Sequence, residues 1–125
     1  MSNWFDTIKD NVLVSVTNDN YSVTLTTDKH VVVLHAEGDC CSNSWFEHVD
    51  DMGAVGGNIT EFTNEGMPEG FVQAPDTEYE CLQYYFMTLK TTKGRVHLEM
   101  RNSSNGYYGG YIGVDLDGKR VSDYY

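Results

Sequence analysis

The sequence has 125 residues and a net charge of −11, from 19 acidic and eight basic residues. A chain of this length can bury a hydrophobic core of its own, so we expect a single domain over residues 1–125. The charge disfavours binding to bulk RNA or DNA, and no apolar run approaches the roughly 18 residues of a membrane span.

The first third of the chain alternates apolar and polar residues, which is typical of half-buried β-strands. The alternation covers residues 12–16, 21–25 and 30–36. Turn-forming residues at 17–20 and 28–29 separate these segments. The short loops predict a three-stranded antiparallel meander.

A strand–turn–helix junction is predicted next. Gly38 permits a tight turn, and the residues after it include several types that cap helix N-termini. A short helix is therefore expected after Cys41 and is expected to end near Gly53. Its apolar residues would share one side of the helix: Trp45, Phe46, Val49 and Met52.

The rest of the chain is predicted to be mostly strand. Residues 58–63 are compatible with a strand, and residues 64–76 form a long acidic loop that holds three apolar residues, Met67, Phe71 and Val72. Such loops are often lids or partner contacts, but these side chains would equally fit against the core. Strands are then expected at 78–90 and 96–101 and, rich in glycine, at 107–116.

These elements define an α+β fold, a mainly antiparallel β-sheet with one short helix packed on it. The two meanders, residues 11–36 and 78–116, are candidates for sharing one sheet. No internal repeat or low-complexity segment interrupts the chain.

The negative charge is concentrated in the middle of the chain. Residues 30–89 contain eleven acidic residues and no Lys or Arg, whereas six of the eight basic residues lie between Lys90 and Arg120. The acidity either keeps a compact protein soluble or forms an interaction surface. The basic residues could hold a small anion locally.

The residue types allow three kinds of reactive site. A nucleophilic Cys40 or Cys41 beside His35 or His48 is conceivable, but neighbouring acids oppose a thiolate. A zinc site from Cys40, Cys41, Cys81 and a histidine lacks the usual spacing between ligands. A divalent-cation site would draw on carboxylates that are also ordinary in turns: Asp50, Asp51, Asp115 and Asp117. We therefore expect no catalytic residue, no metal and no cofactor.

A nucleotide pocket is the fourth and preferred site. Phe86 and Tyr107 could stack on a base, and Arg101 and Arg120 could each bond a phosphate. Asn102 and Asn105 can hydrogen-bond base edges or ribose hydroxyls. Each residue also has a structural explanation, as core aromatic, turn former or ion-pair partner.

The residues from Ala36 to Ser42, Ala-Glu-Gly-Asp-Cys-Cys-Ser, and from Ser44 to His48, Ser-Trp-Phe-Glu-His, resemble a motif of small phage proteins. The motif is similar to that of the Thoeris anti-defence family. The resemblance implies a non-enzymatic sponge for a signalling nucleotide, such as a cyclic ADP-ribose isomer, and in some relatives cyclic oligonucleotides. It also implies a homo-oligomer built from dimers, in the cytoplasm of an infected bacterial host cell.

Two other functions remain open. The sixty residues from 30 to 89, which contain no Lys or Arg, could mimic a nucleic-acid phosphate surface. The chain would then be an acidic inhibitor of a host or defence protein. An enzyme that depends on a cysteine or cleaves a nucleotide is the third reading. A missing signal peptide and an odd count of three cysteines favour a cytoplasmic protein with reduced thiols.

Overall fold

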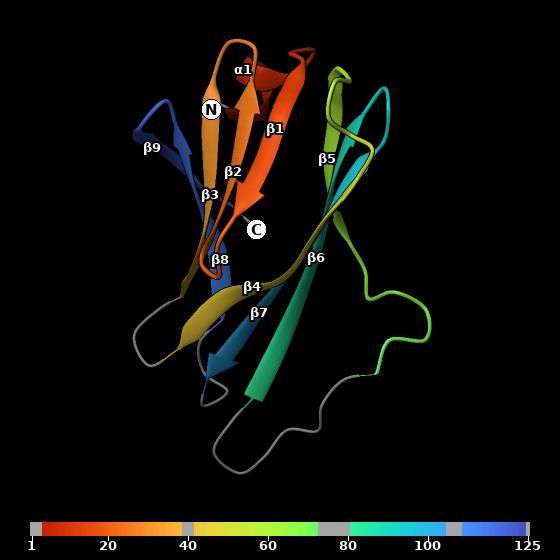
Figure 1. The fold of residues 1–125 in the computed structure, drawn as a ribbon. Coiled ribbons are helices and arrows are strands. Elements are labelled where there is room, and N and C mark those ends of the chain that lie inside the picture. The colour runs from red at the N-terminus through yellow and green to blue at the C-terminus, as the bar shows by residue number, and fades with distance from the viewer. Residues whose placement is uncertain (1–3, 39–41, 73–80, 105–108, 125) are drawn as a thin grey trace.

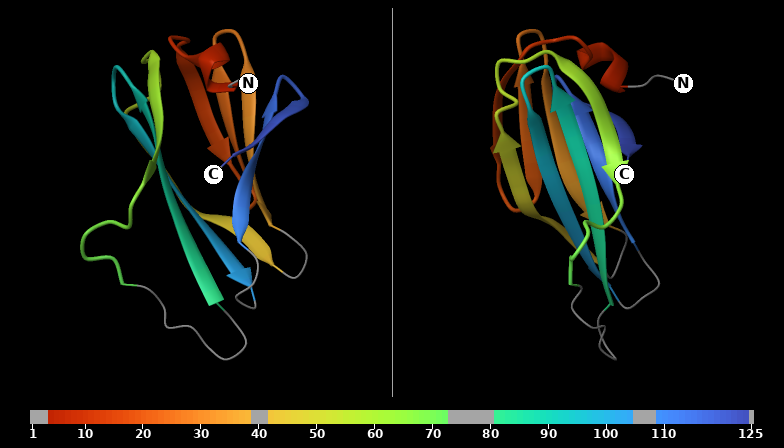
Figure 2. Two further views of the ribbon diagram at one scale, coloured as in Figure 1. Left: turned by 180° about the vertical axis from the view of Figure 1, so that it is seen from behind. Right: turned by 90° about the vertical axis from the view of Figure 1, so that its right-hand side faces the viewer.

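The computed structural model describes residues 4–38, 42–72, 81–104 and 109–124. These residues form two antiparallel sheets that face each other, with one short helix at the N-terminal end (Figures 1 and 2). The elements are α1 (Trp4–Ile8), β1 (Leu13–Asn18), β2 (Ser22–Thr27), β3 (Val31–Gly38), β4 (Asn43–Met52), β5 (Ile59–Glu65), β6 (Cys81–Thr91), β7 (Arg95–Ser104), β8 (Gly110–Leu116) and β9 (Lys119–Tyr124). The expected fold class, mainly antiparallel β with one short helix, is confirmed.

The strand order distributes the two expected meanders over both sheets. One sheet has the order β1-β2-β3-β8-β9 and the other has the order β4-β7-β6-β5. β1 to β3 do form a meander, but β6 and β7 pair in the opposite sheet, and β8 crosses back to β3. The expectation that residues 11–36 and 78–116 share one sheet is therefore wrong for β6 and β7.

The predicted helix after Cys41 is also wrong, because residues 43–52 form strand β4. A β-bulge between Phe46 and His48 puts an extra residue into the strand. Phe46 and Val49, three residues apart, consequently both face the core, while Trp45 pairs with Arg101 on the outer face. A bulged strand thus reproduces the i, i+3 spacing that is characteristic of a helix.

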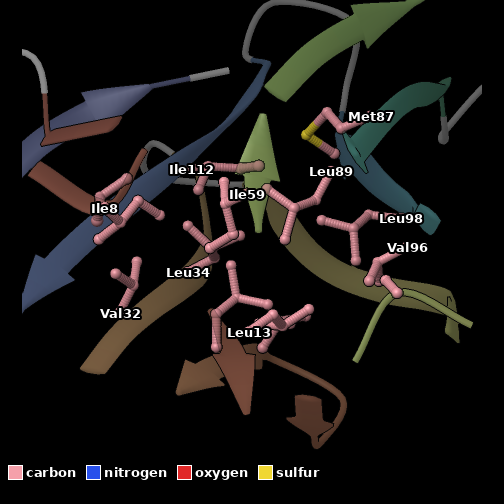
Figure 3. Close-up of a cluster of buried hydrophobic side chains, with 14 of the residues drawn as sticks. Ile8, Leu13, Val32, Leu34, Ile59, Met87, Leu89, Val96, Leu98 and Ile112 are labelled. Atoms are coloured by element: carbon pink, nitrogen blue, oxygen red, sulfur yellow. The ribbon is translucent and has the colours of Figure 1, made fainter. Parts of the chain in front are cut away.

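The space between the sheets is filled by apolar side chains from both layers (Figure 3). Val32 and Leu34 from β3 and Ile112 from β8 are fully buried in one sheet. Met87 and Leu98 from β6 and β7 are buried in the other. Trp4 and Ile8 of the helix are buried and close one end of this core.

The two sheets are joined by backbone hydrogen bonds near both ends. At one end, Leu13 donates to the Gly57 carbonyl over 2.9 Å, and Ile59 donates to the Asn11 carbonyl over 2.8 Å. At the other end, the Phe46 amide donates to the Asn20 carbonyl over 2.7 Å. Among the described residues, no helix has the length and apolar character to cross a membrane.

Candidate functional site

The outer face of the four-stranded sheet carries a pocket of about 360 Å³. Its position follows from strand register, because residues that alternate along paired strands share one face. Phe86 of β6 lies opposite Glu99 of β7, which lies opposite His48 of β4. The pocket is therefore built from one rung of neighbouring strands and lies on the side away from the core.

The next rung supplies a second set of polar groups to the same pocket. Thr88 lies opposite His97, and His97 lies opposite Asp50. The Thr88 hydroxyl is 3.2 Å from Nδ1 of His97, so the imidazole is anchored on one side. Two imidazoles and carboxylates on strand positions thus surround an aromatic floor at Phe86.

The segment after β5 covers one side of this pocket. Gly66 and Pro68 contribute to its wall. The Phe71 ring packs edge-on against both Tyr84 and Phe86, with centroid separations of 5.2 Å in each case. This packing places Phe71 on the outer aromatic face of the four-stranded sheet, away from the inter-sheet core.

The other two apolar side chains of this loop are exposed. Val72 is 86% exposed and Met67 is 42% exposed. Neither belongs to the buried core cluster, so these two side chains do not pack against the core.

Arg101 lies beside the pocket and is bound by carboxylates of its own chain. Its Nε donates to Oε2 of Glu99 over 2.6 Å, and its Nη1 lies 3.7 Å from Oε1 of Glu47. The guanidinium also lies over the Tyr84 ring, 5.1 Å from the centroid. A phosphate that binds Arg101 would therefore have to displace or share an internal carboxylate.

Arg120 is on the opposite sheet and is paired more tightly. Its Nη1 and Nη2 donate to the two Glu37 oxygens over 2.7 and 3.0 Å, and its Nε donates to Asp115 over 2.8 Å. The Arg120 hydrogen bond, followed by the one from His35, holds the pKa of Asp115 below its usual value. This pair crosses Gly113, where any Cβ would overlap the Glu37 carboxylate and the Arg120 guanidinium.

Asn102 faces the inside of the sandwich. It is fully buried, and its Nδ2 donates to Oγ of Ser44 over 2.8 Å. Its Oδ1 is buried without a hydrogen-bond partner. The Ser44 hydroxyl donates in turn to the Glu37 carbonyl over 2.8 Å. In the isolated chain, Asn102 is a link between β7, β4 and β3.

The predicted ligand residues thus lie on different surfaces of one chain. Phe86 and Arg101 share the outer face of the four-stranded sheet, Asn102 points inward, and Arg120 lies on the outer face of the five-stranded sheet. The predicted residues Asn105 and Tyr107 lie outside the described part of the chain.

The candidate residues for the three reactive sites are also far apart or outside the described residues. Cys40 and Cys41 lie outside the described residues, Cys81 is a free thiol, and His35 and His48 lie on different sheets. Within the described residues, no cluster of three or more His, Cys, Asp or Glu side chains is arranged to hold a metal ion. Asp51 instead accepts the Ala54 amide over 2.9 Å, as turn acids do.

The nucleotide site predicted from the sequence did not include the six described polar residues that line this pocket: His48, Asp50, Glu65, Thr88, His97 and Glu99. His97 and Glu99 alternate with buried apolar residues on β7, so their position on the outer face could be predicted from the sequence pattern. His48 and Asp50 were candidates only for a Cys–His pair and for metal sites, and the helix predicted for their segment gave no register with β7. Once β4 is read as a strand, the two pairs follow from the register.

The fold and pocket define a β-sandwich with a candidate small-molecule site on its outer face. The chain belongs to the family described as a domain of unknown function, DUF7448, whose model matches residues 6–114. It is also similar to uncharacterized protein L278 of Acanthamoeba polyphaga mimivirus, with 35% identity over 95 residues that cover 70% of each chain. No solved structure matches.

Proposed function

We propose that the protein binds a signalling nucleotide and sequesters it without cleaving it. The observation that carries this proposal is the pocket of about 360 Å³ over Phe86. Small-molecule sites typically occupy about 300–1,000 Å³ and combine an apolar floor with a few polar groups. This pocket has both, and most of its lining residues lie on strands β4, β5, β6 and β7.

The pocket chemistry suits the base and ribose of such a ligand better than its phosphates. Phe86 offers an aromatic surface for base stacking, which contributes roughly 1–3 kcal/mol. Asp50 and Glu99 can accept hydrogen bonds from ribose hydroxyls, and His48 and His97 can bond base edges. The carboxylates would repel a phosphate placed at the same depth.

The phosphates would therefore bind at the arginines. Arg101 is next to Glu99 at the pocket margin, so it can reach a ligand in the same subunit. Arg120 is on the other sheet and could reach that ligand only from a second subunit. A homo-oligomer built from dimers, as the sequence resemblance implies, would supply this second contact.

The proposal extends to an anti-defence role in the cytoplasm of an infected bacterium, with a cyclic ADP-ribose isomer as ligand and cyclic oligonucleotides as further candidates. The alternative is an acidic inhibitor of a host or defence protein. Against it, Lys90, Arg101 and Arg120 each pair with acids of this chain, so the described acidic surface is interrupted by positive charge.

The test is native mass spectrometry of the protein after incubation with cyclic ADP-ribose isomers and cyclic oligonucleotides, followed by heat release of the bound material. The proposal predicts a stoichiometric adduct, returned chemically intact from an oligomer. Phe86→Leu should weaken binding about fivefold or more, because the stacking that it removes contributes roughly 1–3 kcal/mol.

Tyr21→Leu is the matched control, since it removes an exposed ring away from this pocket and should leave nucleotide affinity unchanged. A chemically altered product would refute sequestration and indicate an enzyme. The absence of any adduct would refute the nucleotide proposal and favour the acidic inhibitor.

A further inference from the structure

A second pocket, of about 370 Å³, lies where the β1–β2 turn meets the start of β4. It is lined by Asn20, Tyr21, Asn43, Trp45, Phe46 and Glu47. None of these six residues lines the pocket over Phe86. The second pocket is therefore a separate site, and the proposed nucleotide function does not require it.

The walls of this pocket are held in place by specific hydrogen bonds. The Asp19 carboxylate accepts the amides of Tyr21 and Ser22, each over 2.8 Å, which fixes the turn. The same two bonds lower the pKa of Asp19, so they persist at neutral pH. The Phe46 amide donates to the Asn20 carbonyl over 2.7 Å and docks the turn onto β4.

Trp45 is oriented by its neighbour on the same strand. The indole Nε1 donates to Oε1 of Glu47 over 3.0 Å. This bond lowers the pKa of Glu47, which keeps the carboxylate ionised at neutral pH. The described contacts of Glu47 all use Oε1, which leaves Oε2 available to accept further hydrogen bonds.

The remaining lining groups are neutral and can both donate and accept. In the described part of the chain, no hydrogen bond engages the side-chain amides of Asn20 and Asn43, and both side chains are exposed. Tyr21 presents a ring that is 56% exposed. Among the described residues, no Lys or Arg lines the pocket. Glu47 contributes a negative charge that Arg101 offsets only in part, at 3.7 Å and while also bound to Glu99, so an anionic ligand is disfavoured.

We propose that this pocket binds an uncharged sugar ring. The apolar C–H face of a pyranose or furanose would lie against the Trp45 indole, which supplies a flat hydrophobic surface. Its hydroxyl groups would donate to Oε2 of Glu47 and exchange hydrogen bonds with the amides of Asn20 and Asn43. The fixed turn lowers the entropic cost of binding, because the walls are already in place.

The chain provides its own reporter for the test. Its two tryptophans differ in exposure, since Trp4 is 4% exposed in the core and Trp45 is half-buried at the pocket. Saturation-transfer NMR and protection of Trp45 fluorescence from acrylamide would be measured with four probes. These are the methyl glycosides of glucose, galactose, mannose and ribose, which separate pyranose from furanose ligands.

At least one probe should give saturation transfer on one ring face and protect Trp45, with an affinity on the order of millimolar. If methyl glucoside is a probe that binds, methyl glucuronide should bind at least about tenfold more weakly, because the Glu47 carboxylate repels the carboxylate of the uronic acid. Trp45→Leu and Asn43→Ala should each abolish or weaken the signal by about tenfold, since they remove the stacking surface and an amide.

Asn18→Ala is the matched control, because it removes an exposed amide of the same hairpin that does not line the pocket. Phe86→Leu should also leave sugar binding unchanged, which separates this site from the nucleotide site. If Trp45→Leu does not fold, Asn43→Ala decides the result. The proposal is overturned if no probe gives a signal at about 50 mM, or if the signal persists in both folded pocket variants.

Discussion

The buried link between Ser44 and Asn102 can be tested by a double-mutant cycle. The Ser44 hydroxyl makes two 2.8 Å hydrogen bonds, to the Glu37 carbonyl and from Asn102 Nδ2. Each such bond contributes about 1 kcal/mol, and a buried group left unpaired costs about 1–3 kcal/mol. Ser44→Ala should therefore lower the free energy of unfolding by about 2–3 kcal/mol.

The second side of the cycle is Asn102→Ala, which also removes the buried Oδ1 that has no partner. In the Asn102→Ala protein, the Ser44 hydroxyl keeps its hydrogen bond to the Glu37 carbonyl but no longer accepts one from Asn102. Ser44→Ala should then cost about 1 kcal/mol less than in the parent, and that difference is the coupling energy.

Urea unfolding followed by tryptophan fluorescence would give the four free energies. Ser103→Ala, one position away on the outer face of β7, is the control and should change stability by no more than about 0.5 kcal/mol. Additive effects of Ser44→Ala and Asn102→Ala, or a loss below about 0.5 kcal/mol for Ser44→Ala, would show that the buried link is not a stabilising network.

Two further outcomes follow from close packing and from charge. Gly94→Ala should lower stability by about 1–3 kcal/mol in urea unfolding, because its Cβ would overlap the Met52 carbonyl; an unchanged midpoint would contradict this. The Arg120 hydrogen bond holds the pKa of Asp115 in the folded protein below the usual value of 3.8. The ionised Asp115 therefore stabilises the fold fully above about pH 5, and this contribution is lost as the pH falls below about 4. Asp115→Asn should flatten that acid limb of the stability profile, and an identical profile would rule out the linkage.

The strands were largely predictable, but the bulges were not. Val23 and Leu25 alternate regularly and are buried as expected. In β1, a register shift between Leu13 and Ser15 buries Leu13 and leaves Val14 50% exposed, whereas the regular alternation expected over residues 12–16 would put Val14 on the half-buried face with Val12 and Val16. A bulge depends on the partner strand, which a single segment of sequence does not specify.

The candidate site was predictable only in part, because strand pairing brings distant residues together. Phe86 and Arg101 were found as candidate ligand residues from their residue types. His48 and Glu99 became neighbours only through the pairing of β4 with β7. The ion pairs of Arg101 and Arg120 with internal carboxylates were an open alternative in the sequence, and only the distances identify the partners.

The pairing of β3 with β8 has a consequence for how the chain acquires its structure. Val32 lies opposite Leu116, so the five-stranded sheet joins segments from the two ends of the sequence. Contacts between such distant residues are slow to form, because a long loop must close before any hydrogen bond is gained. During synthesis, one edge of β3 in the β1–β3 meander has unpaired backbone groups until residues 110–116 have left the ribosome. The interval before β8 arrives is when this protein is most exposed to mispairing with another chain.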